Sequence, residues 1–177
     1  MRIGIDVSPA IRRYKTGTEW YTYNLIEALK KVDLTNHFFL LYSPIPLSAE
    51  LAQLPARWQN KVLPWPFKYL WTQIRLSLEM LFNQPDVLFV PAHAIPLIHP
   101  KKVITTIHDL GFERFPEAYT RWQRFYYRFA HRFAAEHATK IIVPSEFTKR
   151  ELINLYNVSS EKIVVVPLGY DSNIFKV

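Results

Sequence analysis

Seven short runs of β-branched and other apolar residues constrain the fold of this chain more than any other feature. They cover residues 2–7, 37–43, 61–64, 86–90, 102–108, 140–144 and 162–167. Several are apolar without alternation and rich in valine and isoleucine, which is typical of parallel strands that are covered on both faces. The runs therefore predict a mainly parallel sheet of seven strands.

Apolar residues recur at helical spacing in four segments between these runs. The segments cover about residues 18–32, 66–82, 120–138 and 145–156, and Thr18, Thr120 and Ser145 are the expected N-caps. Because strands and helices alternate, right-handed crossovers between parallel strands predict a doubly wound α/β domain with helices on both faces of the sheet. A length of 177 residues suits one such domain.

Composition excludes several classes of protein. The chain has no cysteine, which excludes disulfides, thiolate nucleophiles and zinc-thiolate sites and favours a cytoplasmic location. Its four glycines, at positions 4, 17, 111 and 169, fit neither G-x-G-x-x-G nor a P-loop, which counts against NAD enzymes and nucleoside triphosphatases. The net charge of +7 favours anionic partners. No apolar run approaches the roughly 18 residues that span a bilayer, so we expect a soluble or peripheral protein.

A glycine and several polar residues follow the predicted strands, at the edge where sheets of this type bind ligands. They are Gly17, His93, His108, Asp109, Ser145 and Glu146. Gly17 lies in a loop with Arg12, Arg13 and Lys15, and this loop leads into a helix whose N-terminus favours an anion. The loop is either a phosphate site or a solvated surface loop, and the sequence pattern leaves both interpretations open.

His108 and Asp109 stand at the end of a strand rich in valine, isoleucine and threonine. A histidine at this edge can bind a phosphate or a sugar hydroxyl, or accept a proton. Alternatively, His108 bonds to a neighbouring backbone group and Asp109 makes an Asx-turn into the loop. A His-Asp pair also occurs in metal-dependent phosphohydrolases, but there it belongs to an all-helical bundle, so we expect no metal site here.

The helix predicted over 120–138 carries two stripes of side chains. The basic stripe consists of Arg121, Arg124, Arg128 and Arg132. The aromatic stripe consists of Trp122, Phe125, Tyr126, Phe129 and Phe133. In one interpretation the aromatic rings pack in the core and the arginines face solvent. In the other, the helix lies against anionic lipid headgroups. We recognise no nucleic-acid-binding module, so a nucleic acid is not an expected partner.

Six stretches of the chain carry a family resemblance: "MRIGIDVSPA", "TGTEWYTYNLIEAL", "PDVLFVPAH", "VITTIHDLGFERFPEAY", "KIIVPSEFTKREL" and "KIVVVPLGYDSNIF". In this order they resemble the N-terminal domain of the retaining, family 4 (group 1) glycosyltransferases of the GT-B fold. The resemblance runs through essentially the whole chain. It implies a Rossmann-like, acceptor-binding domain over residues 1–167, one half of a GT-B fold, with residues 168–177 starting a linker to a C-terminal donor-binding domain.

The resemblance also implies an activity. Such an enzyme, of hexosyltransferase type, moves a sugar from a nucleotide-sugar donor to an acceptor hydroxyl with retention, without a bound metal or other cofactor. The acceptor is expected to be a glycan or a lipid-linked glycan, in cell-surface polysaccharide or glycolipid synthesis, and a peripheral location at the inner face of the membrane fits this role. Without the donor-binding half, the fragment alone is expected to be inactive. The alternative is a non-catalytic α/β module that binds a sugar-phosphate or another polyanion.

Particular residues match the family motifs. The resemblance places His108 beside the donor sugar and phosphate, with a role in orientation and charge stabilisation. Gly17 and Thr18 match the donor phosphate loop, although many members have a second glycine there and this chain has Thr18 and Glu19. The expected acceptor pocket consists of Asp109, Phe112, Glu113, Glu19 and His93, and Ser145 with Glu146 begins the helix that faces the cleft.

Overall fold

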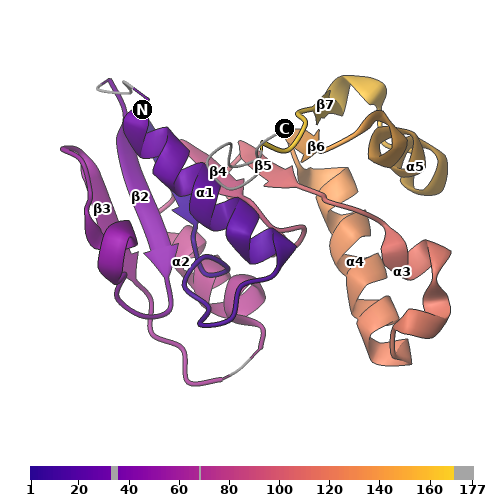
Figure 1. The fold of residues 1–177 in the computed structure, drawn as a ribbon, viewed down its shortest axis with the longest axis horizontal. Coiled ribbons are helices and arrows are strands. Elements are labelled where there is room, and N and C mark those ends of the chain that lie inside the picture. Colours follow the sequence, from indigo (N-terminus) through magenta and orange to yellow (C-terminus); the bar gives the residue numbers. More distant parts are fainter. Residues whose placement is uncertain (33–35, 68, 170–177) are drawn as a thin grey trace, which may run out of the picture.

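The computed structural model describes residues 1–32, 36–67 and 69–169. Its centre is a seven-stranded sheet in which all neighbouring strands are parallel, in the order β3-β2-β1-β4-β5-β6-β7 (Figure 1). The strands are β1 Arg2–Asp6, β2 Phe38–Ser43, β3 Trp58–Val62, β4 Val87–Val90, β5 Val103–Thr106, β6 Lys140–Val143 and β7 Ile163–Val165. The predicted doubly wound α/β fold with seven strands is therefore confirmed.

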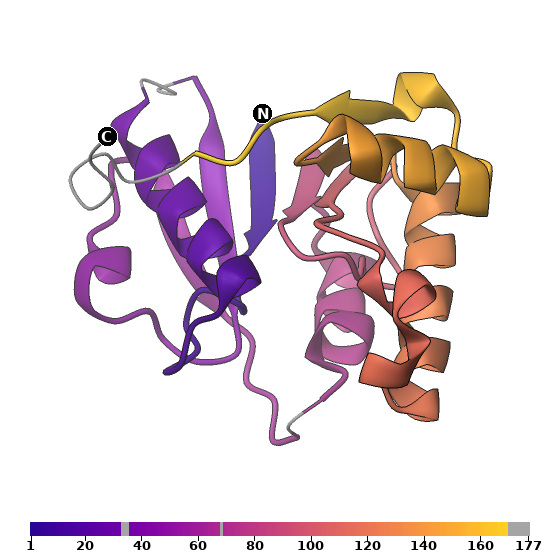
Figure 2. The ribbon, with the colours of Figure 1, turned by 45° about the vertical axis from the view of Figure 1, so that its right-hand side comes forward.

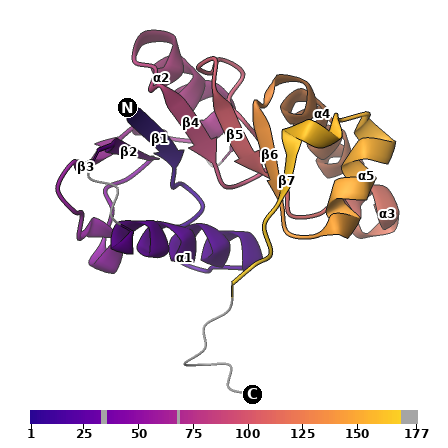
Figure 3. The same cartoon turned by 90° about the horizontal axis from the view of Figure 1, so that it is seen from above.

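Helices lie on both faces of the sheet (Figure 3). They are α1 Gly17–Lys31, α2 Ser77–Phe82, α3 Gly111–Arg114, α4 Arg121–His137 and α5 Glu146–Tyr156, with a π-helical turn η2 Trp71–Leu76 before α2 and 3₁₀ turns η1 Ala49–Ala52, η3 Pro116–Ala118 and η4 Ser160–Lys162. The side with α1 and η1 carries one apolar cluster, which includes Ile26 and Leu51. A larger cluster joins the sheet to α2, α4 and α5, from which it takes Met80, Ala134 and Leu152.

Gly4 allows a large side chain to lie across the middle of the sheet. A Cβ atom at this position would stand 2.7 Å from the ring of Tyr42 and 2.8 Å from Pro85. Tyr42 is fully buried and belongs to the larger cluster. The glycine in "RIGID" is therefore a packing requirement of the core.

One predicted strand is displaced along the chain. The sequence pattern indicated residues 61–64, whereas β3 spans Trp58–Val62. Trp58 stacks on Phe39 of β2, with ring centroids 4.2 Å apart, and the side-chain amide of Asn60 donates to the Leu41 carbonyl at 2.9 Å. β3 lies at the edge of the sheet and pairs with only one neighbouring strand. Polar residues are therefore tolerated in it, and apolar runs in the sequence do not locate it.

One predicted N-cap was wrong. The N-cap of α1 is Thr16 instead of Thr18, and Glu19 accepts from the Thr16 amide at 3.1 Å and from its hydroxyl, which closes a capping box.

For α4 both interpretations of the aromatic stripe were open, and the structure divides the stripe: Phe133 packs against the larger core cluster, whereas Trp122, Phe125 and Phe129 are exposed. The buried face of α4 consists of Ala130, His131, Ala134 and Ala135, and small side chains let the helix approach the sheet closely.

The boundary of the predicted linker falls largely outside the described residues. Of the segment 168–177, the structure describes only Leu168 and Gly169, and both are exposed. The assignment of residues 1–167 to one domain and of 168–177 to a linker stays a prediction.

Candidate functional site

The strand order of the sheet reverses at β1. β1 lies between β2 and β4, so the chain leaves β1 toward one side of the sheet and later strands are added on the other. The loops after β1, β4, β5 and β6 meet at this carboxyl edge, with the N-terminal end of α1 beside them (Figure 2). In open α/β sheets this is the place where ligands bind.

The first turn of α1 presents free backbone donors. Gly17 and Thr18 are its first two helical residues, and among the described residues their N–H groups have no acceptor. A Cβ atom added at Gly17 would meet nothing within 4 Å, so the space above this turn is open. An anion can therefore approach these N–H groups at the positive end of a 15-residue helix.

The basic residues of the preceding loop are held in place by other contacts. Arg12 donates to Glu19 at 2.9 Å, and Glu19 is buried. The Lys15 ammonium lies 5.4 Å from the ring centroids of both Trp20 and Tyr23. Glu19, predicted in the acceptor pocket, is thus engaged in capping α1 and in pairing with Arg12.

His108 lies beside α1. Its Nε2 is 3.1 Å from the Pro91 carbonyl, which can only accept, so Nε2 carries a proton. Burial lowers the pKa of His108, which keeps the ring neutral near pH 7 and leaves Nδ1 as an acceptor. The Tyr21 ring meets the imidazole edge to face at 4.7 Å, and the Tyr21 hydroxyl bonds to Thr106 at 3.2 Å.

Tyr21 connects His108 to the open turn of α1. Residues three and four apart share a helix face, so Gly17 and Thr18 lie one turn above Tyr21 on the side that faces His108. The structure therefore brings the phosphate-loop candidates and the histidine candidate together at one edge. The backbone bond of His108, foreseen as the alternative to a functional role, is also present.

His93 connects His108 to the helix α4. Its ring stacks on His131 of α4 at 5.2 Å and 20°, and lies edge to face with His108 at 6.3 Å. His93 Nδ1 and His131 Nε2 are buried without a hydrogen-bond partner in the described structure. Burial lowers the pKa of His93 to about 4 and that of His131 to about 3, so both rings are neutral near pH 7.

Asp109 and Ser145 organise the backbone around His108. Asp109 Oδ1 accepts from the Gly111 N–H at 2.8 Å, which is the predicted Asx-turn. Ser145 is the N-cap of α5 and accepts from the Thr148 amide at 3.2 Å, and the Thr148 hydroxyl donates to the His108 carbonyl at 3.4 Å. The exposed Glu146 begins α5 at the same edge.

Two of the predicted acceptor residues, Phe112 and Glu113, contact side chains of α4 and α5, and the Phe112 ring lies 4.7 Å from that of His131. Phe112 is buried in the larger core cluster. Glu113 accepts a bidentate contact from Arg128, at 2.6 and 2.9 Å, and a hydrogen bond from Tyr156 at 2.9 Å. The contact with Arg128 lowers the pKa of Glu113. Both side chains are engaged in holding α3, α4 and α5 together.

The arginines of α4 differ in their surroundings. Arg128 is paired with Glu113, and Arg124 is partly buried. Arg121 and Arg132 are exposed. Large apolar side chains are exposed across α2, the loop after β4 and α4, and we call this set the apolar face: Leu78, Leu81, Phe82, Leu97, Ile98, Trp122, Phe125 and Phe129.

The sequence pattern missed three residues of the site. Tyr21 read only as part of an apolar helix face, His131 was not singled out, and Thr106 lay inside a strand. Tyr21 meets His108 and bonds to Thr106, which is 85 residues away, and His131 stacks on His93. The one local signal for His131 in the sequence is that a polar ring stands on an otherwise apolar helix face.

Within residues 1–32, 36–67 and 69–169, no cluster of three or more histidine and carboxylate side chains has a geometry that could hold a metal ion. None of the helices found there has the length and apolar character needed to cross a bilayer.

The fold and site together define the class of the protein. The crystal structure of HepE from Anabaena in complex with UDP-glucose has a TM-score of 0.59 over 98% of this chain and 45% of that chain, at 14% identity. A glycosyltransferase from Rickettsia africae has a TM-score of 0.50, over 99% and 45% of the two chains, also at 14% identity. The chain is a Rossmann-like α/β domain of the type found in GT-B glycosyltransferases.

Sequence comparison gives the family. The model of "Glycosyltransferase Family 4" matches residues 15–173, so the chain belongs to glycosyltransferase family 4 and corresponds to its N-terminal domain. The O-antigen chain mannosyltransferase RfbU of Salmonella typhimurium is 26% identical over 104 residues, which make up 59% of this chain and 28% of that protein. The chain thus spans less than half the length of these relatives.

Proposed function

We propose that this domain takes part in sugar transfer from a nucleotide-sugar to a glycan acceptor, in polysaccharide or glycolipid synthesis. The observation that carries the proposal is the meeting of the open N-terminal turn of α1 with His108 at the switch point of the sheet. HepE, which shares the fold, was crystallised with UDP-glucose, and RfbU is named as a mannosyltransferase. Retention of configuration, transfer of a hexose and the need for a C-terminal donor-binding domain belong to the same proposal.

His108 then orients the donor sugar. Because Nε2 is bound to the Pro91 carbonyl and the ring is neutral, Nδ1 can accept a hydrogen bond from a sugar hydroxyl. The diphosphate of the donor lies at the N-H groups of Gly17 and Thr18, where the helix dipole offsets the charge that develops as the bond to the sugar breaks. This division assigns the phosphates to the helix and the sugar to the histidine.

The valine variant of Gly17 tests this placement. In the complete gene product, Gly17→Val should raise KM for the nucleotide-sugar about tenfold, because a branched side chain blocks close approach of phosphate to the backbone. Its free energy of unfolding should stay near that of the parent, since the new side chain meets open space. Steady-state transfer kinetics and urea unfolding measure the two quantities.

Arg121→Val is the matched control for Gly17→Val. Arg121 is also the first residue of its helix and is exposed, but it belongs to α4 and not to the turn of α1 that we assign to the phosphates. This variant should leave KM for the donor unchanged. Equal KM values for the parent and Gly17→Val would remove the phosphate site, and the polyanion-binding alternative would fall with it.

We also propose that the apolar face rests on an anionic membrane surface. Trp122 and Phe125 are 80% and 66% exposed, and the exposed Arg121 and Arg132 stand on the same helix. Aromatic rings flanked by arginines are typical of helices that lie in the headgroup region. Contact of this kind would place the site next to lipid-linked acceptors at the inner face of the membrane.

Liposome sedimentation tests the membrane proposal. Trp122→Ser combined with Phe125→Ser should lower the bound fraction on vesicles containing anionic lipid about tenfold, because two inserted rings are lost. Tyr14→Ser is the matched control, since Tyr14 is also 80% exposed but lies outside the apolar face. Equal sedimentation of the parent and the double variant would contradict the proposal.

A further inference from the structure

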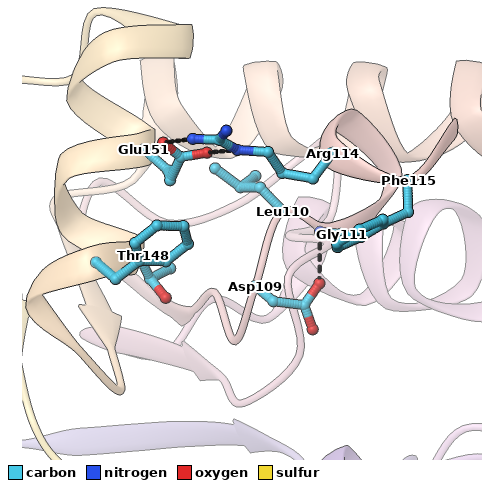
Figure 4. A pocket seen from close by; sticks show the side chains of 8 residues that line it. Asp109, Leu110, Gly111, Arg114, Phe115, Thr148 and Glu151 are labelled. Carbon is cyan, nitrogen blue, oxygen red and sulfur yellow. Dashed lines mark hydrogen bonds and ion pairs between the residues drawn. The ribbon is translucent and has the colours of Figure 1, made fainter.

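Asp6 is a buried carboxylate at the carboxyl edge of the sheet that the proposed transfer function does not use. It is the last residue of β1 and is 2% exposed. Its Oδ1 accepts from the Ser8 N–H at 2.9 Å, and its Oδ2 accepts from the Thr72 hydroxyl at 3.2 Å. Asp109 also comes after a strand, but its carboxylate bonds to Gly111 within its own loop (Figure 4). Asp6 instead reaches an element 66 residues away.

The surroundings of Asp6 do not suit a charged side chain in general. Burial raises the pKa of Asp6, and the donors of Ser8 and Thr72 together with the charge of Arg12 oppose this shift. Removing a carboxylate from water is costly, and an apolar side chain would fill the end of a buried strand without that cost. Core packing therefore does not explain an aspartate at this position, whereas its two hydrogen bonds do.

Thr72 reaches Asp6 from an unusual backbone segment. It is the second residue of the π-helical turn η2, and Leu70, directly before that turn, has a φ of 64°, in the left-handed region that leucine rarely adopts. The indole N–H of Trp71 donates to the Leu63 carbonyl at 3.0 Å, which anchors the turn in the core. Because π-helical turns and strained backbone concentrate at functional sites, the position of Thr72 calls for a functional explanation.

Asp6 connects η2 to the loop that leads into α1. Figure 3 shows α1 and α2 on opposite faces of the sheet, and η2 continues directly into α2. Residues 8–16 form the loop between β1 and α1. Near the end of this loop, Arg12 pairs with Glu19, which caps α1. Asp6 therefore fixes the start of the loop and Glu19 fixes its end, directly before Gly17.

We propose that Thr72 and Asp6 are positioning residues for the first turn of α1. By fixing the start of the loop, they hold the Gly17 and Thr18 N–H groups ready for a diphosphate, without contacting the anion themselves. When the bond between Thr72 and Asp6 is lost, the loop has to be ordered as the anion binds, and this cost lowers affinity. The inference rests on the proposed function, because that function assigns the phosphates to this turn.

Binding of inorganic pyrophosphate to the complete gene product, measured by isothermal titration calorimetry, tests the proposal. Pyrophosphate represents the diphosphate of a nucleotide-sugar, and its binding needs no transfer. Thr72→Val keeps the shape of the side chain but loses the donor, and it should weaken pyrophosphate affinity about fivefold. Thr72→Ser keeps the hydroxyl and should bind within about twofold of the parent.

Thr139→Val is the matched control for Thr72→Val. The Thr139 hydroxyl also makes hydrogen bonds, to the Lys101 carbonyl at 3.3 Å and from the Val103 N–H at 3.1 Å, but Thr139 stands directly before β6, at the amino edge of the sheet. This variant should keep the parent's pyrophosphate affinity, whatever its free energy of unfolding in urea. A purely structural role of Thr72 would likewise lower stability and leave the affinity of Thr72→Val at the parent value.

The Gly17→Val variant separates this inference from the proposed function. Weaker pyrophosphate binding by Gly17→Val, with equal affinities of the parent and Thr72→Val, would overturn the inference and leave the proposed function standing. Equal weakening in Thr72→Ser and Thr72→Val would also overturn it, because the hydroxyl would then not be the group that matters. Absence of pyrophosphate binding to the parent, or equal affinities of the parent, Gly17→Val and Thr72→Val, would remove the phosphate site and this inference with it.

Discussion

Alanine at position 108 should lower kcat for sugar transfer by the complete gene product about 100- to 1,000-fold, the range seen when one oriented hydrogen-bonding group is lost from an active site. The expected loss follows from the position of His108, which is fixed by the Pro91 carbonyl on one side and by the Tyr21 ring on the other. A neutral imidazole held in this way keeps one acceptor nitrogen aimed at a fixed point. Removing it leaves the sugar free to rotate while its phosphates remain bound.

Two variants separate this role from a structural one. His108→Asn places an amide oxygen near the former Nδ1, so it should recover at least about tenfold of the activity lost in His108→Ala. His99→Ala should have parent activity, because His99 lies in the loop before β5, at the opposite edge of the sheet. Circular dichroism verifies that each variant is folded. A His108→Ala enzyme within threefold of the parent rate would remove His108 from the mechanism.

Acid should destabilise the domain through the stacked pair of His93 and His131. Their pKa values in the folded state, about 4 and about 3, lie below the usual value of 6.5 because burial disfavours the charged rings. Between pH 6.5 and these lower pKa values, the unfolded state therefore binds more protons than the folded state. The stability that the neutral pair contributes is present above pH 6.5 and is lost as the pH falls. Asp109, Glu19 and Glu113 offset this only in part.

Urea unfolding at pH 7 and pH 4 measures the effect of each ring. Replacing His131 by leucine should reduce the loss of unfolding free energy between these pH values by about 3 kcal/mol, at 1.36 kcal/mol for each pKa unit. His137→Leu is the control, because His137 makes the same contact with the carbonyl four residues earlier but is exposed. Its pH dependence should match the parent. If the parent and His131→Leu lost the same unfolding free energy between pH 7 and pH 4, this result would contradict a neutral, buried stack of His93 and His131.

Much of the fold could be predicted because strands and helices leave local patterns. For six strands, the ends predicted from the β-branched runs lie within two residues of the ends in the structure, and the lack of alternation in these runs indicated a parallel sheet. β3 was displaced because an edge strand accepts residues such as Asn60 that satisfy polar groups instead of filling a core. The aromatic stripe of α4 left two interpretations open for a related reason, since hydrophobicity does not say whether a ring faces the core or a partner.

The candidate site was predictable only in outline. Topology brought Gly17, His93 and His108 to one edge, since each directly follows a strand or begins a helix there. Phe112 and Glu113 also come after β5, yet the short helix α3 turns them into the core and toward Arg128. Contacts such as Tyr21 with His108 depend on the distance between α1 and β5, which no local pattern in the sequence encodes.

The position of a bound nucleotide-sugar tests the central claim most directly. A crystal structure of the complete gene product with its donor should show the diphosphate within hydrogen-bonding distance of the Gly17 and Thr18 N–H groups, and a sugar hydroxyl at Nδ1 of His108. A nucleotide-sugar bound elsewhere, with the first turn of α1 and His108 both left without contact to it, would contradict the claim.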